Sequence, residues 1–132
     1  MKDLFMKGGI CYLSLTSSME DYLKAILVLH QQHGYVRCID VADYLGVSKP
    51  SVSRAVKELT KSGHIIKKDG TLYLTQQGRQ YAEQICERYQ FFTARLVDAG
   101  VDRKTAEHDA CNIEHAISAE AFQKLKSSLT NK

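Results

Sequence analysis

Residues 41–74, VADYLGVSKPSVSRAVKELTKSGHIIKKDGTLYL, decide the fold of this chain. Gly46 separates two runs whose apolar residues recur at helical spacing. Ser48 can cap the second run, and Gly63 ends it. Two strand-like runs follow, separated by Asp69-Gly70, the dipeptide preferred in two-residue hairpin turns. Helix, tight turn, helix and hairpin in this order predict a winged helix-turn-helix domain.

Helices are expected on both sides of this stretch. Ser17-Ser18-Met19-Glu20 is a capping-box pattern, which predicts a helix that ends at Gly34. Thr75 can cap a long helix reaching about Ala99, whose apolar seam is too long for the winged domain alone to cover. Two shorter helices should follow, the first starting at Asp102 or Thr105 and the second running from Ala119 to about Leu125.

The predicted fold class is therefore mainly α with a small β-hairpin wing, in which a helical domain follows the winged helix. We expect an N-terminal extension over 1–16, a winged-helix domain over 17–75, and a helical domain over 76–132.

Composition is typical of a globular protein. The 132 residues carry a net charge of only +3, so an affinity for nucleic acid requires a local cluster of basic residues. The four cysteines contain no C-x-x-C pair, which favours a reducing compartment over a disulfide framework. The N-terminal apolar run is too short for a signal peptide and no segment is long enough to span a membrane, so a cytoplasmic protein is expected.

The second helix of the helix-turn-helix motif has the composition of a DNA-recognition helix. Hydroxyl and basic side chains near its start can meet base edges, while lysines on the helix and wing hold phosphates. The alternative is that these residues are only the solvated face of a small domain, but the order of the elements favours DNA binding. The predicted DNA-binding residues are Ser48, Lys49, Ser51, Ser53, Arg54, Lys57, Lys67 and Lys68.

The stretch Cys111-Asn112-Ile113-Glu114-His115 predicts a metal site. Its thiol, carboxylate and imidazole stand at i, i+3 and i+4 of a helix and so project from one face. This mixture suits Fe²⁺, Mn²⁺, Co²⁺, Ni²⁺ or Zn²⁺ and leaves the coordination shell open. Asp21 is the candidate for the fourth ligand; Glu107 and His108, one turn before Cys111, could join or form an adjacent site. The alternative is a small buried cysteine beside two solvated side chains.

Three segments together resemble the iron- and manganese-dependent repressors of the diphtheria toxin repressor type: 18–23, 41–74 and 109–115. The similarity runs from about Ser17 to Leu125, and the length leaves no room for the SH3-like domain of longer members. The resemblance implies a homodimer, in which 17–75 form the DNA-binding domain and 76–132 form a helical metal-binding and dimerisation domain. It also implies Fe²⁺ or Mn²⁺ as the favoured ion, held by the positions of Asp21, Cys111, Glu114 and His115, and repression at a palindromic operator near metal-uptake genes. A cysteine at position 111 is the residue type of iron-responsive members.

Two positions depart from the family pattern. Lys24 stands where manganese regulators have a glutamate, and Tyr89 where the family typically has a histidine, and neither is a good metal ligand. One metal site is therefore expected, and Lys24 could pair with Asp21 or Glu114 and take over part of the cation's electrostatic role.

Other functions remain open from the sequence. A winged-helix regulator could respond to thiol oxidation or a small ligand, with altered or lost metal dependence. A metalloenzyme, with Glu114 as general base, has no H-E-x-x-H motif to support it, so an enzyme is not expected. The last alternative is a protein-interaction module.

Overall fold

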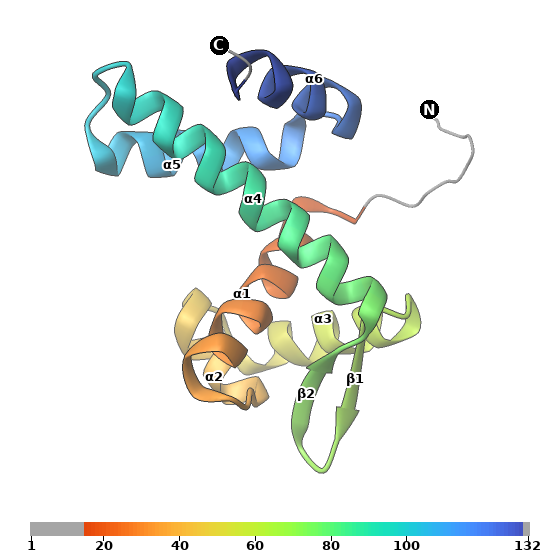
Figure 1. The fold of residues 1–132 in the computed structure, drawn as a ribbon. Coiled ribbons are helices and arrows are strands. Elements are labelled where there is room, and N and C mark those ends of the chain that lie inside the picture. The colour runs from red at the N-terminus through yellow and green to blue at the C-terminus, as the bar shows by residue number, and fades with distance from the viewer. Residues whose placement is uncertain (1–14, 131–132) are drawn as a thin grey trace.

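The computed structural model describes residues 15–130, so most of the expected N-terminal extension and the last two residues lie outside the described part. Figure 1 shows the winged domain at one end of the molecule and α6 at the other, with α4 running between them. The elements are α1 (Ser17–His33), α2 (Cys38–Leu45), α3 (Lys49–Lys61), β1 (Ile65–Lys68), β2 (Thr71–Leu74), α4 (Gln76–Asp98), α5 (Arg103–Ala116) and α6 (Ala119–Thr130). The mainly helical fold with one hairpin confirms the predicted fold class.

The core of the winged domain is built around α1. Leu23 and Ile26 of α1 are almost fully buried and share one apolar cluster with residues from α2, α3 and both strands. The strands pair antiparallel, and Asp69 and Gly70 both have positive φ, at 53° and 78°, as the predicted hairpin turn requires. The stretch before α2 forms no strand, although the Leu72 amide donates to the Val36 carbonyl at 2.7 Å.

Most predicted helix starts are confirmed, and one is wrong. Ser48, Thr75 and Asp102 each accept a hydrogen bond from a backbone amide in the first turn of α3, α4 and α5. The predicted Ser17–Glu20 capping box is not formed, because the N-cap of α1 is Thr16, whose hydroxyl accepts from the Met19 amide. The last helix continues to Thr130, beyond the predicted end.

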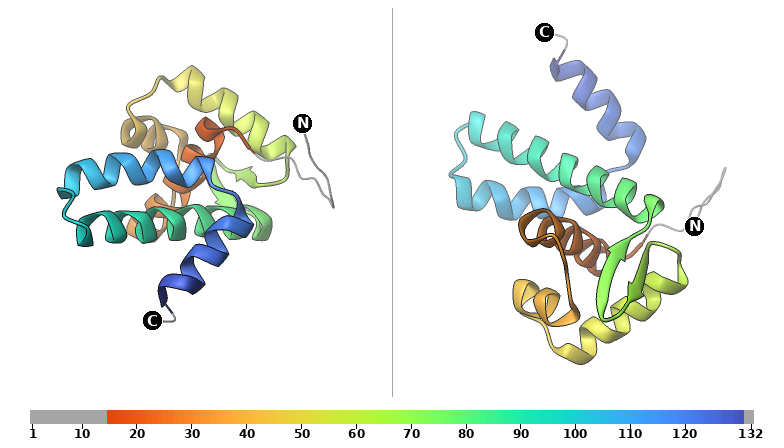
Figure 2. Two further views of the ribbon diagram at one scale, coloured as in Figure 1. Left: turned by 90° about the horizontal axis from the view of Figure 1, so that it is seen from above. Right: turned by 60° about the horizontal axis from the view of Figure 1, so that its bottom comes forward.

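The second core joins α4, α5 and α6. Phe92 of α4, Ala110 of α5 and Phe122 of α6 form a buried cluster, which covers the outer half of α4 as its long apolar seam requires. Figure 2 shows α5 running back alongside α4 in both views, so that its C-terminal half approaches α1. The fold thereby brings the start of the winged domain against the helix that carries Cys111, Glu114 and His115.

Candidate metal centre

Four of the predicted metal ligands lie together. One ligand atom from each of Asp21, Cys111, Glu114 and His115 can be chosen so that all four atoms are within 4.8 Å of one another. Asp21 comes from the first turns of α1, and the other three project from one face of α5 because they stand at i, i+3 and i+4. Glu114 is fully buried, and the other three side chains are partly buried.

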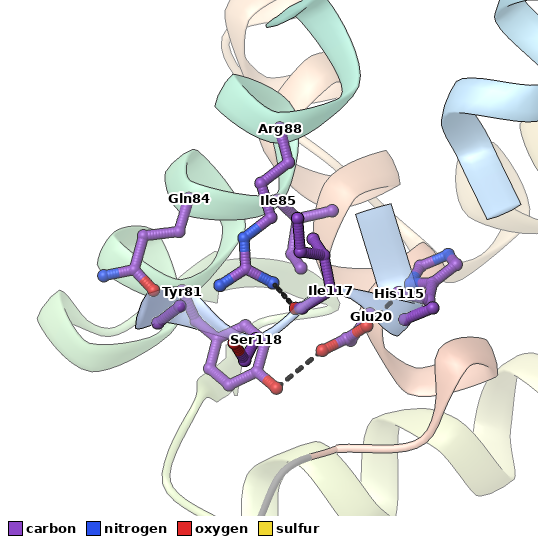
Figure 3. A pocket seen from close by; sticks show the side chains of 10 residues that line it. Glu20, Tyr81, Gln84, Ile85, Arg88, His115, Ile117 and Ser118 are labelled. Carbon is purple, nitrogen blue, oxygen red and sulfur yellow. Dashed lines mark hydrogen bonds and ion pairs between the residues drawn. The ribbon is translucent and has the colours of Figure 1, made fainter. Parts of the chain in front are cut away.

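His115 is held from both sides. Its Nδ1 lies 2.6 Å from Glu20 Oε1, and its Nε2 lies 3.0 Å from Asp21 Oδ1 and 3.4 Å from Glu114 Oε2. The second oxygen of Glu20 accepts a hydrogen bond of 2.6 Å from the Tyr81 hydroxyl. Figure 3 shows Tyr81, Glu20 and His115 in one row. Glu20 therefore orients the imidazole so that Nε2 faces the other candidate ligands.

Sequence reasoning missed Glu20 and Tyr81 as part of this site. Glu20 was assigned to a local cap, whereas its partners are 61 and 95 residues away along the chain. Burial and the hydrogen bond to Glu20 raise the pKa of Tyr81, so its hydroxyl keeps its proton and donates it to the carboxylate. No local signal distinguishes this pair from a capping box and a core tyrosine.

Lys24 occupies the remaining side of Glu114. Its Nζ lies 3.2 Å and 3.0 Å from the two carboxylate oxygens and 4.5 Å from the centre of the Tyr89 ring. Of the two pairings that the sequence left open for Lys24, the structure has the one with Glu114. Burial alone lowers the pKa of Lys24, but the charge of Glu114 raises it on balance, so the side chain is an ammonium group at neutral pH.

The remaining groups determine what a metal must displace. Burial raises the pKa of the Cys111 thiol, so this sulfur carries a proton at neutral pH until a cation stabilises the thiolate. Burial also raises the pKa of Glu114, against the opposing charge of Lys24. Both ring nitrogens of His115 face carboxylate oxygens, so a metal bound at Nε2 must replace the contact of this nitrogen with Asp21.

The donor set fits a divalent transition ion. A sulfur, an imidazole nitrogen and two carboxylate oxygens suit ions of borderline softness, and a histidine whose other nitrogen donates to a carboxylate is the usual arrangement around metal-bound imidazole. These residues could hold one ion, with Lys24 as a charged neighbour.

The structure does not bring Glu107 and His108 to this cluster. Glu107 pairs with Arg103 at 3.5 Å, and His108 lies 3.6 Å from Asp109 with 78% of its side chain exposed. Glu107 lies one turn before Cys111 but is paired with Arg103, and His108 is exposed, so neither belongs to the cluster of ligand atoms.

A pocket of about 620 Å³ opens on the other side of Glu20 and His115. Arg88 forms part of its wall and donates to the carbonyl oxygens of Glu114 and Ile117, at 3.3 Å and 3.2 Å. These bonds satisfy the exposed carbonyls at the end of α5 and fix this end against α4. After Glu20 and Tyr81, Arg88 is a third residue of the site that sequence reasoning missed.

The predicted DNA-binding residues lie on α3 and the wing, at the end of the molecule opposite α6 (Figure 2, right). All are exposed except Ser51, which is partly buried. Ser48 and Ser51 are hydrogen-bonded to each other through their hydroxyls at 2.9 Å, and Ser48 also caps α3. Their hydroxyls are thus committed to the helix start, whereas the side chains of Lys49, Arg54 and Lys57 extend from the exposed surface of α3.

Comparison with known proteins identifies the family. The model for the N-terminal DNA-binding domain of iron-dependent repressors matches residues 14–70, and the model for their metal-binding and dimerisation domain matches residues 75–131. The chain belongs to the iron-dependent repressor family. It is accordingly a metal-dependent transcriptional regulator with a DNA-binding half and a metal-binding and dimerisation half.

Relatives agree with this membership. The chain is 36% identical to the HTH-type transcriptional regulator MntR of Listeria welshimeri, over 83% of this chain and 78% of that protein. It is 32% identical to MntR of Geobacillus thermodenitrificans, over 83% and 79% of the two chains. A solved manganese-dependent transcriptional repressor in complex with manganese superposes with a TM-score of 0.75 at 25% identity, over 85% of this chain and 52% of the other.

No helix in residues 15–130 is both long and apolar enough to cross a membrane.

Proposed function

We propose that this repressor binds one divalent ion through Asp21, Cys111, Glu114 and His115, and that the bound ion strengthens its binding to a palindromic operator. The support is the placement of the four side chains, whose ligand atoms lie within 4.8 Å of one another. Asp21 belongs to the helix around which the winged domain is built, and the other three belong to α5 of the dimerisation half. One ion therefore ties the two halves together.

The consequence for DNA binding is geometric. A dimer that reads two half-sites must hold its two recognition helices about one helical turn of DNA apart. The ion fixes α1 against α5, and α1 shares a buried core with α3, so the ion restricts where α3 lies relative to the dimer core. Metal and operator then strengthen each other's binding by the same factor, because they favour the same arrangement.

Fe²⁺ is the ion we propose first, and Mn²⁺ second. The Cys111 sulfur favours Fe²⁺, since a thiolate is a softer ligand than the oxygen donors that Mn²⁺ prefers. The named relatives and the solved manganese complex keep Mn²⁺ as the alternative.

We further propose that the winged domain ends at residue 75, that the helical domain begins at 76, and that the protein acts in the cytoplasm on the DNA of metal-uptake genes.

Asp21 offers the most specific test. Binding of a fluorescent duplex is measured at graded salt, in chelator and in anaerobic Fe²⁺ or Mn²⁺, for the wild type, Asp21→Asn and Asp109→Asn. Asp109 is exposed on the same helix as the other ligands and serves as the matched control. Wild type and Asp109→Asn should gain affinity with metal, whereas Asp21→Asn should gain little. Equal affinity of the wild type in chelator and in both metals would exclude the proposed coupling.

A further inference from the structure

The ammonium group of Lys24 lies beside the proposed ligands, and the proposed function gives it no role. It reaches from α1 to α5, where it donates to both oxygens of Glu114 at 3.2 Å and 3.0 Å. Its side chain is 19% exposed and that of Glu114 is fully buried, so this ion pair is poorly screened by solvent.

This position gives Lys24 the electrostatic role of a bound cation. A buried carboxylate is costly unless a positive charge compensates it, and Lys24 supplies that charge in the absence of metal. The Tyr89 ring, 4.5 Å below Nζ, adds a favourable face for the cation. Because Lys24 and Asp21 are on the same helix, the pair joins the same two elements that we expect a metal ion to join.

Two further contacts between described residues join α1 to α5, namely the hydrogen bonds that His115 makes with Glu20 and with Asp21. Together with the Lys24–Glu114 pair, they hold the helices in contact before any ion binds. A divalent ion carries twice the charge of Lys24 and can bind Asp21 and the α5 ligands at once, so it still adds to the contact.

We propose that Lys24 is a built-in cation of the metal centre, which holds α1 against α5 without metal and lets the metal-free repressor keep part of its operator affinity. This inference rests on the proposed function. It predicts that Lys24 reduces the factor by which metal raises operator affinity, and that this factor grows when the charge of Lys24 is removed.

The test compares the wild type with Lys24→Met, which removes the charge at similar length, and Lys24→Arg, which keeps it. The probe is a fluorescent duplex enriched from a random-sequence library by the Fe²⁺-loaded wild type, and its affinity is measured in chelator and in anaerobic Fe²⁺. Thermal unfolding by circular dichroism checks that each protein is folded. If Lys24→Met is unfolded in chelator, Lys24→Gln replaces it, because an amide can still donate to Glu114.

Lys24→Met should lose about tenfold or more of its duplex affinity in chelator, as expected for the loss of a coupling between sites. Fe²⁺ should restore most of that affinity, and Lys24→Arg should behave as the wild type does. If Lys24→Met loses the same duplex affinity in chelator and in Fe²⁺, Lys24 is merely structural. If it loses no duplex affinity in chelator, Lys24 does not hold α1 against α5. Either result overturns the inference while the proposed function stands. If Fe²⁺ leaves the affinity of all three proteins unchanged, the proposed function and the inference fail together.

Discussion

Replacing Glu20 by glutamine should weaken metal binding although Glu20 is not one of the proposed ligands. Glu20 is only 6% exposed and accepts two hydrogen bonds of 2.6 Å, one from His115 Nδ1 and one from the Tyr81 hydroxyl. Glutamine has nearly the same shape but no charge, and its amide nitrogen must face one of these two donors. The variant therefore loses the charged acceptor that orients the His115 ring.

The size of the effect follows from the role of this bond. Loss of a carboxylate that supports a metal-bound histidine typically lowers metal affinity about 10- to 100-fold, which corresponds to roughly 1.4 to 2.7 kcal/mol. The metal-free protein should also lose stability, by about 1.5 to 3 kcal/mol for one hydrogen bond to a charged group. Both effects share one cause, since the same bond joins α1 to α5 with and without the ion.

Calorimetry with anaerobic Fe²⁺ measures the affinity, and urea unfolding in chelator measures the stability. Tyr81→Phe is the matched control, because it removes the other hydrogen bond of Glu20 and leaves the His115 contact in place. It should change the metal affinity far less than Glu20→Gln does. Unchanged Fe²⁺ affinity in Glu20→Gln, or a larger loss in Tyr81→Phe, would refute this reasoning.

Three further predictions concern the fold and the DNA-binding surface. Gly78→Ala should lower the free energy of urea unfolding by about 3 kcal/mol or more, because its Cβ would lie 1.9 Å from the His64 carbonyl oxygen. Gln77→Ala is the control, and an equal loss of stability in both variants would contradict this prediction. Burial lowers the pKa of His64, so the contribution of His64 to stability is complete above about pH 6.5 and is lost as the pH falls toward the folded-state pKa. The free energy of unfolding should therefore differ less between pH 7.5 and pH 5.5 in His64→Gln than in the wild type, and an equal difference in both proteins would contradict this prediction. Lys57→Ala should weaken duplex binding and reduce the slope of log affinity against log salt concentration by about 0.9, whereas Lys104→Ala on α5 should change neither. Equal slopes for the wild type and both variants would show that Lys57 does not contact a phosphate.

Local sequence signals predicted most of the fold. Gly46, Asp69-Gly70 and the caps Ser48 and Thr75 act within a few residues, so each could be assigned without knowing the tertiary structure. The helix α6 runs to Thr130, beyond the predicted end at about Leu125, because residues 126–130 contain no Gly or Pro that would mark where the helix ends.

The site was predictable only in part. The spacing of Cys111, Glu114 and His115 fixes a common helix face, and their partner Asp21 followed from the need for another ligand. The capping-box pattern describes a local bond of Glu20, whereas its partners Tyr81 and His115 lie on α4 and α5. The sequence also leaves two partners open for Lys24, and the choice between them depends on the approach of α1 to α5, which brings together residues 90 positions apart in the chain.

The central claim is that one ion couples α1 to α5 and thereby the metal site to the operator. Calorimetric titration of Fe²⁺ into the repressor, alone and in the presence of saturating duplex, tests this most directly. The account predicts that duplex tightens Fe²⁺ binding by the same factor by which Fe²⁺ tightens duplex binding. An Fe²⁺ affinity that is identical with and without duplex would contradict it.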